Sequence, residues 1–220
     1  MGIVTKIDLC SAALVSLGAA GISSFDEGSA ESILAASLYD VTYEGLLSNH
    51  PWGFAKKTSQ LALLNKTPIA NYNYAHQLPS DFMRAISLGD AGHGVTRGLD
   101  YQIIGRQLHS NKTSVMLQYI FKPNEQDLPA WFKKCLIDHL AAEFCLPLLE
   151  NTSRANLLSN RAQLELAHAK SIDSQQKPPN NKTAFQAGFL PPNWRQEPRL
   201  KLIMRGQNGL IMCFACQRAG

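Results

Sequence analysis

The stretch Asn49-His50-Pro51-Trp52-Gly53-Phe54-Ala55 decides how this chain folds, because one helical pattern ends there and another is predicted to begin. His50 precedes a proline, which disfavours the helical backbone region, while Pro51 suits the first turn of a following helix. Two large aromatic side chains at the joint are expected to fill the gap between the helices. We interpret this corner as structural, either in an ordinary helical core or as the signature of a family. It consists of His50, Pro51, Trp52 and Phe54.

Two amphipathic helices are predicted before the corner. The first covers residues 3–17, with capping-box spacing between Thr5 and Asp8 and with Gly18 at its end. The second is expected to be capped by Ser24 or Asp26. Its apolar stripe runs through Ala30, Leu34, Leu38, Val41, Leu46 and Leu47, and Tyr39 and Tyr43 form a second apolar edge. A helix with two apolar edges packs against more than one neighbour.

After the corner we expect a short helix and then a region of strands. The short helix carries Phe54, Lys56, Lys57 and Leu61, and the helical periodicity is lost from Pro68 onward. Residues 82–88 read as a strand, and residues 101–109 and 113–121 as a hairpin that turns at residues 110–112. The glycine-rich residues 89–98 between them predict an exposed loop.

Two further helices are predicted after residue 126. Asp127 is expected to cap the first, which has apolar residues every four positions and is kinked or ended by Pro147. The second covers residues 153–172 and is capped within residues 151–153. The predicted inward-facing residues are Phe132, Leu136, Leu140 and Phe144 in the first helix and Leu157, Leu164 and Ala167 in the second.

These elements predict an α+β fold. Residues 1–68 and 126–173 form a helical bundle of four to five helices, and residues 69–125 form an inserted antiparallel β domain. Residues 174–220 form an extended basic C-terminal arm. The charge is divided in the same way, because residues 1–173 contain 14 Lys and Arg against 16 Asp and Glu, whereas residues 174–220 contain 7 against 1.

The arm alternates basic and apolar residues, which suits an acidic, partly apolar protein groove better than a nucleic acid. We therefore predict that it docks on a protein partner, and binding to DNA is the alternative. The docking residues are Phe185, Phe189, Trp194, Arg195, Arg199, Lys201 and Arg205.

No catalytic residues, metal ligands or cofactor site are predicted. The six histidines are not spaced as a zinc site, and the pairs Asp138-His139 and Glu165 with His168 read as solvated helix faces. Cys213 and Cys216 have the spacing of a redox motif but lack the expected strand and helix context, so a small redox enzyme is only a third hypothesis. The other three cysteines read as buried apolar residues. Nothing in the sequence predicts a membrane anchor or a secretion signal.

With these elements in order, the chain resembles the head-to-tail adaptors of short-tailed phages, the tail tubular protein A family. The likeness covers about residues 3–173. It is carried by these segments: Leu14-x-x-Leu17-Gly18, residues 22–27, Tyr39-Asp40, Leu46-Leu47-x-x-His50-Pro51-Trp52-x-Phe54-Ala55, Tyr72-x-Tyr74-Ala75-x-Gln77-Leu78-Pro79-Ser80-Asp81, Tyr101-x-Ile103-x-Gly105-Arg106, Tyr119-Ile120, Leu140-Ala141 and Ile172-Asp173.

The resemblance implies a virion structural protein of the head-tail interface that is not an enzyme. Its expected partners are further copies of itself in a ring, a dodecamer in the family, together with the portal protein, the tail nozzle protein and a tail fibre. Genome DNA would pass through the channel without specific binding. Because each subunit of a ring presents two different sides to its neighbours, Tyr39 and Tyr43 are expected contacts between subunits. Residues 174–220 match no pattern of the family. The alternative is a DNA-binding accessory protein that uses its basic tail.

Overall fold

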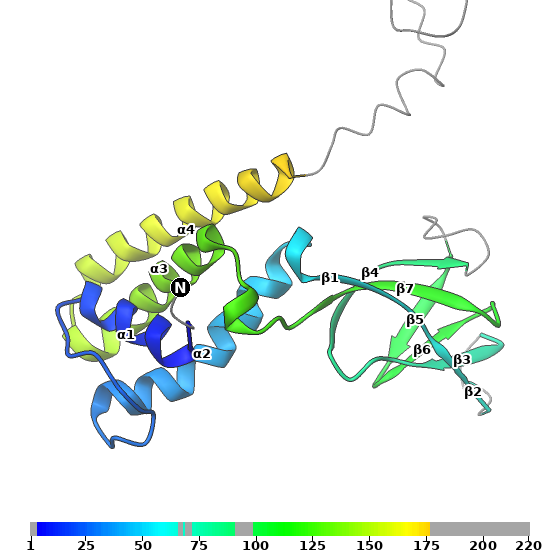
Figure 1. Cartoon of the computed structure of the whole chain (residues 1–220), viewed down its shortest axis with the longest axis horizontal. Helices are drawn as coiled ribbons and strands as arrows, with labels where there is room; N and C mark the ends of the chain where they lie inside the picture. Colours follow the sequence, from blue (N-terminus) through cyan, green and yellow to red (C-terminus); the bar gives the residue numbers. More distant parts are fainter. Residues whose placement is uncertain (1–3, 66–67, 69–71, 91–98, 177–220) are drawn as a thin grey trace, which may run out of the picture. The chain divides into compact units, whose positions relative to one another are not determined.

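The computed structural model describes residues 4–65, 68, 72–90 and 99–176, and the chain has the predicted α+β fold (Figure 1). Within this part there are four α-helices and two small antiparallel sheets. The helices are α1 (Lys6–Ser16), α2 (Ala30–Asn49), α3 (Ala130–Leu149) and α4 (Thr152–Gln175). The predicted arm, including all seven docking residues and the Cys213 and Cys216 pair, lies outside the described residues except for the first three positions, which continue α4 and its cap.

The ends of α1 follow the predicted signals. The Thr5 hydroxyl accepts a hydrogen bond from the Asp8 backbone N–H (3.2 Å), and the Asp8 carboxylate accepts one from the Thr5 N–H (2.8 Å). Hydrogen bonds from the Thr5 side chain and backbone lower the pKa of Asp8. At the other end Gly18 has φ +80°, and the Ala19 N–H bonds the Leu14 carbonyl (3.1 Å), as in a Schellman motif.

The start of α2 differs from the prediction. Its N-cap is Ser29, whose hydroxyl accepts a hydrogen bond from the Ser32 N–H (3.1 Å), rather than Ser24 or Asp26. The earlier residues form a loop around the Glu27 carboxylate, which accepts hydrogen bonds from the Ser23 N–H (2.7 Å) and the Ser24 N–H (3.0 Å). Because Glu27 satisfies these backbone groups, the helix begins only at Ala30.

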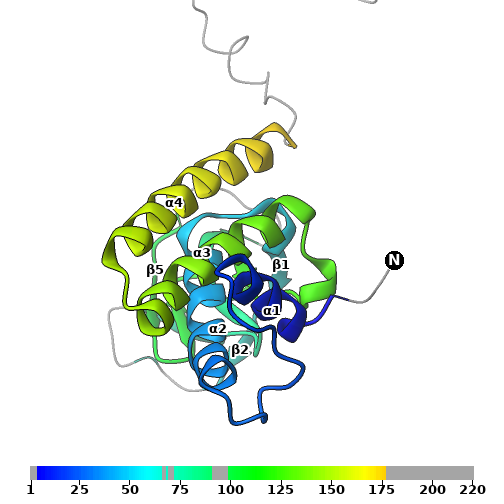
Figure 2. The ribbon, with the colours of Figure 1, turned by 90° about the vertical axis from the view of Figure 1, so that its left-hand side faces the viewer.

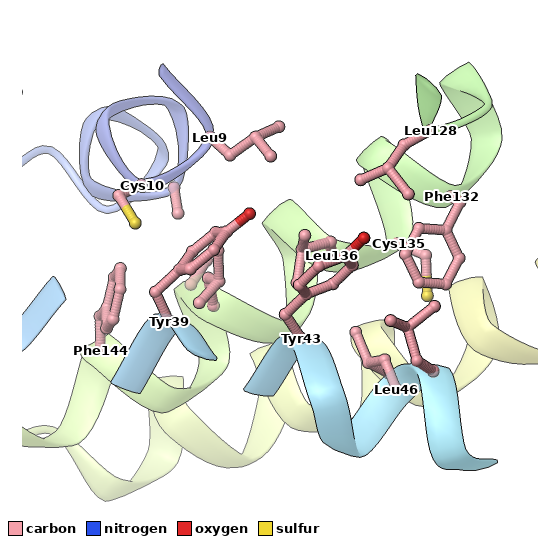
Figure 3. Packing of buried hydrophobic residues seen from close by; sticks show 14 of the residues in the cluster. Leu9, Cys10, Tyr39, Tyr43, Leu46, Leu128, Phe132, Cys135, Leu136 and Phe144 are labelled. Carbon is pink, nitrogen blue, oxygen red and sulfur yellow. The ribbon is translucent and has the colours of Figure 1, made fainter. Parts of the chain in front are cut away.

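The inward face of α2 also differs, and this corrects the interpretation of Tyr39 and Tyr43 as subunit contacts. Both rings are buried, and Figure 3 shows them in the space between α1, α2 and α3. The Tyr43 hydroxyl donates to the Pro123 carbonyl (2.8 Å), and the Tyr39 hydroxyl donates to Glu125 (3.3 Å). The hydroxyls therefore find partners within the subunit, and the stripe rotates so that Val41 faces outward.

The faces of α3 and α4 were predicted with mixed success. Phe132, Leu136, Leu140 and Phe144 of α3 are all buried, as predicted. In α4 the predicted Leu157 and Leu164 are exposed, and the buried positions are Ala162, Leu166, Ala169 and Asp173. Small residues on this face allow α4 to lie close against α3.

Of the N-caps predicted for α3 and α4, one is confirmed and the other is wrong. Asn151 caps α4 by accepting from the Arg154 N–H (2.9 Å), as predicted. Asp127 does not cap α3, because it belongs to a 3-10 turn at Glu125–Asp127 and Pro129 occupies the N-cap. Pro147 lies within α3, which ends two residues later before Glu150 in the left-handed region (φ 49°).

The strands form two sheets. The first has the order β1 (Lys56–Gln60), β7 (Val115–Phe121), β4 (Phe82–Asp90), and the second has β2 (Ala62–Leu64), β3 (Tyr74–Gln77), β6 (Gln107–Ser110), β5 (Tyr101–Ile104). Residues 56–60 and 62–64 are thus strands instead of the predicted short helix, and the strand region begins well before residue 69. Buried Leu61 separates β1 from β2 and marks the change of sheet.

The predicted hairpin of residues 101–109 with 113–121 is wrong. Gly105 adopts φ +60°, a conformation that glycine tolerates, so the chain turns there and β5 pairs with β6. β6 then pairs with β3, whereas β7 pairs with β1 and β4. The segment 111–114 is a connection between sheets rather than a tight turn.

Candidate functional site: the corner after α2

The corner at His50, Pro51, Trp52 and Phe54 lies where α2 ends and the first strand begins. α2 ends at Asn49, and His50 is extended (φ −139°, ψ 146°), as its position before a proline requires. No α-helix follows Pro51. A single 3-10 turn at Gly53–Ala55 leads directly into β1, which corrects the prediction that the proline opens a helix.

Trp52 is the centre of an aromatic cluster and is fully buried. Its ring centroid lies 4.7 Å from that of His50, 5.2 Å from Phe132, 5.6 Å from Trp131 and 6.1 Å from Phe54. The indole Nε1–H donates to the Leu46 carbonyl (2.9 Å), one of the last carbonyls of α2. The prediction that the Trp52 ring fills the space at the corner is confirmed. Its indole N–H also satisfies a backbone carbonyl at the end of α2.

A buried carboxylate fastens the corner to α4. Asp173 Oδ1 accepts a hydrogen bond from the Gly53 backbone N–H (2.7 Å), and Asp173 Oδ2 lies 3.4 Å from His50 Nε2. We call this contact the carboxylate latch. A Cβ atom at residue 53 would lie 3.0 Å from Asp173 Oδ1, so glycine allows the carboxylate to reach the backbone.

Two more hydrogen bonds hold the same joint. Lys170 of α4 donates to the Asn49 side chain (2.7 Å), and Arg84 of β4 donates through Nη1 to the Ser48 carbonyl (2.5 Å). The last turn of α2 is therefore bound by α4 on one side and by a strand on another. The hydrogen bonds at the corner therefore fix the directions of α2, α4 and β4 relative to one another.

A second polar cluster, here called the Asp81 cluster, lies in the strand region. The Asp81 carboxylate accepts hydrogen bonds from Lys57 (2.8 Å) and from the Tyr119 hydroxyl (2.9 Å). Burial opposes the ionisation of Asp81, but these hydrogen bonds outweigh it, and its pKa is lowered. Burial and the bond to Asp81 raise the pKa of Tyr119 to about 12.

Arg106 extends this cluster. Its Nη2 donates to the carbonyls of Pro79 (3.0 Å) and Ser80 (3.3 Å), and its own carbonyl accepts from the Leu78 N–H (3.2 Å). Because Gly105 makes the preceding turn, Arg106 is held against the Leu78–Ser80 backbone. The Gln-Leu-Pro-Ser-Asp segment thus forms contacts with two distant parts of the chain.

A third cluster joins α2 to the end of β7. Lys122 binds Asp40 and Glu44 (2.8 Å to each), and Lys6 lies 3.3 Å from Asp40. The hydrogen bond from Lys122 is the largest cause that lowers the pKa of Asp40. Both carboxylates are therefore paired with lysine side chains.

The remaining sequence candidates that lie within the described residues are two acid-histidine pairs and three cysteines. Asp138, expected on a solvated face, is buried and paired with Lys134 and Arg161, whereas His168 is exposed as predicted. Cys10, Cys135 and Cys145 are buried free thiols, as predicted, and burial raises the pKa of Cys10 and of Cys135 to about 12. Among the described residues no three His, Cys, Asp or Glu side chains are grouped to hold a metal ion. Within the same residues no helix has both the length and the hydropathy of a membrane span.

The sequence interpretation missed the partner of the corner, Asp173. One signal was present, because a carboxylate in the last turn of a helix opposes the helix dipole and so requires another partner. Comparison of the chain with protein-family models gives no match, and comparison with curated proteins gives none either.

Proposed function

We propose that this chain is a virion structural protein, a head-to-tail adaptor that forms a ring between the portal and the tail nozzle. In this proposal the ring is built from copies of the chain, as a dodecamer, and the genome passes through its channel. The proposal begins from the likeness to the tail tubular protein A family described above. It implies no enzymatic activity and no cofactor.

The observation that carries the proposal is the placement of the segments behind that likeness. Segments far apart in the chain contact one another directly: Tyr119 bonds Asp81, and Arg106 bonds the Pro79 and Ser80 carbonyls. The corner likewise bonds Asp173, 120 positions away from Gly53. These contacts support the proposal because they join the segments of the likeness within one folded unit.

The charge of the body supports the same proposal. Residues 1–173 carry slightly more acidic than basic groups, so they suit a channel wall that lets DNA slide, because walls rich in lysine bind phosphate strongly. A continuous basic belt on the surface that faces the channel would contradict this part of the proposal. The basic arm is proposed to dock on the portal, and the tail nozzle and a tail fibre are further proposed partners.

The test is the mass of the complex formed with the portal protein of the same phage, measured by size exclusion with light scattering. The full chain is compared with a chain that stops after Gln176, which retains the whole of α4 and the carboxylate latch. We expect a large complex with the full chain and its loss on truncation. A chain that stays at 24.2 kDa with and without portal protein would contradict the adaptor.

The second candidate is a DNA-binding accessory protein, favoured by the 7 basic residues against 1 acidic residue in positions 174–220. It predicts that the full chain retains DNA in a salt-sensitive way and that truncation after Gln176 abolishes retention. Salt-sensitive retention without portal binding would replace the adaptor proposal by this one.

A further inference from the structure

One face of α2 carries apolar side chains that no described residue covers. Ile33 is 62% exposed and Val41 is 69% exposed. Asp40 and Glu44 follow Ile33 at helical spacing and lie on the same face, which we call the α2 stripe. α2 contains no lysine or arginine, so the groups that the helix itself contributes to this stripe are apolar or acidic.

One face of α4 has the same apolar pattern with the opposite charge. Leu157 is 66% exposed and Leu164 is 73% exposed. Arg154, Arg161 and His168 are exposed at steps that place them on the same face, which we call the α4 stripe. Leu157 and Leu164 were predicted to face the core, but the core side of α4 is built from smaller residues, so a second apolar face is left outside.

The two stripes point away from each other. α4 packs on α3, and α2 packs on another side of α3, so α3 lies between them in both views (Figures 1 and 2). Each stripe lies opposite the buried side of its own helix. A single chain therefore cannot bring its two stripes together.

The stripes match each other in spacing and charge. Ile33 and Val41 are eight residues apart, about 12 Å along a helix, and Leu157 and Leu164 are seven apart, about 10.5 Å. Lys122 pairs with Asp40 and Glu44, Lys6 pairs with Asp40, Arg161 pairs with Asp138, and Arg154 donates to the Leu17 carbonyl. The stripe side chains Asp40, Glu44 and Arg161 are still about half exposed. They are free to face a partner while keeping their internal contacts.

We infer that the α4 stripe of one copy docks on the α2 stripe of the next copy of this chain. The contact joins two different surfaces, so each copy has one of each to offer and the assembly continues until rotation closes it. This inference rests on the proposed ring, for which it names the subunit contact.

The first test is the mass of two double variants of the full chain by light scattering, alone and with portal protein. One carries Leu157→Glu and Leu164→Glu, and the other carries Ile33→Glu and Val41→Glu. Each is expected to lose the assemblies that the unaltered chain forms and to remain at 24.2 kDa. Val15→Glu, at another exposed apolar position on a helix, is the matched control and is expected to assemble normally.

The sharper test is to mix the two double variants. Each retains one intact stripe, so the mixture is expected to form a dimer of twice the single mass and nothing larger. A contact between identical surfaces cannot give this result. Circular dichroism melting of each variant checks that the fold is retained.

Assemblies that persist in either double variant, or a mixture that stays monomeric, would overturn the inference. Such a result leaves the adaptor proposal standing if the chain still binds portal protein. An unaltered chain that is monomeric with and without portal protein would overturn both.

Discussion

The helical bundle and the strand region are stabilised in different ways. The bundle buries large rings in one cluster, including Trp52, Phe132 and Phe144, and its buried tyrosine hydroxyls have partners. The strand region has a smaller apolar cluster and buries two histidines, His76 and His109. Its charged groups, such as those of the Asp81 cluster, are only partly shielded from water.

This difference teaches where each region is sensitive. Burial of large apolar groups makes the bundle depend on volume and shape. The strand region depends on polar contacts, and the buried Nδ1 atoms of His76 and His109 have no hydrogen-bond partner among the described residues. Core truncations should therefore affect the bundle most, whereas the strand region should respond to changes in its polar contacts and in pH.

The largest expected effect is that of Trp52→Ala, which tests whether the stability of the helical bundle depends on its buried aromatic volume. Removal of a buried ring costs about 3–5 kcal/mol of unfolding free energy. Urea denaturation followed by circular dichroism measures it. Leu63→Ala, at an exposed position of β2, is the control and should change stability by less than about 0.5 kcal/mol. Equal effects of the two variants would contradict the assigned role of Trp52.

Removal of the carboxylate latch should have an intermediate effect on the free energy of unfolding. It tests whether the joint between α2 and β1 contributes to the stability of the helical bundle. Asp173→Ala leaves the Gly53 N–H without its acceptor, at a cost of about 1–3 kcal/mol. Asp173→Asn retains an acceptor oxygen and should cost less. Glu165→Ala, on the same helix, removes only a loose pair with His168 and should cost no more than about 1 kcal/mol. If Asp173→Ala is as stable as Glu165→Ala, the carboxylate latch does not stabilise the fold.

The smallest expected effect concerns the Asp81 cluster and its dependence on pH. Tyr119→Phe removes one hydrogen bond and should cost about 1 kcal/mol at pH 7. The pKa of Asp81 is lower in the folded chain than in the unfolded chain. Its stabilisation is therefore fully present above the unfolded pKa, about 3.9, and is lost as pH falls through the folded pKa.

This prediction is checked by urea denaturation at pH 7 and at pH 3. Asp81→Asn should be less stable than the unaltered chain at pH 7, and the difference should shrink at pH 3. Asp100→Asn, at an exposed position next to β5, serves as the control. A difference that stays constant with pH would show that the ionised form of Asp81 is not what stabilises the strands.

The helices could be predicted from the sequence more fully than the pairing of the strands. The four-residue spacing of Phe132, Leu136, Leu140 and Phe144 identified the buried face of α3, because a long helix repeats its pattern several times. α4 has alanines on its buried side and leucines on its exposed side, so apolarity alone selected the wrong face. Only the neighbouring helix decides which face is covered.

The strands were harder because their partners lie far apart in the sequence. β1 has no apolar alternation, and its pairing with β7 is what makes it a strand. The tight turn at Gly105 was overlooked, since the apolar residues on both sides of it read as one strand. The corner was recognised from Pro51 and Trp52, whereas its partner Asp173 depended on a contact across 120 positions.

The carboxylate latch also has a mechanical consequence. Helix ends ordinarily fray at almost no free-energy cost, and a helix pulled from its end peels away one turn at a time. Asp173 lies in the last turn of α4 and is bonded to Gly53, at the joint between α2 and β1. Tension applied to the chain after Gln176 is therefore transmitted to that joint before it can peel α4 from α3.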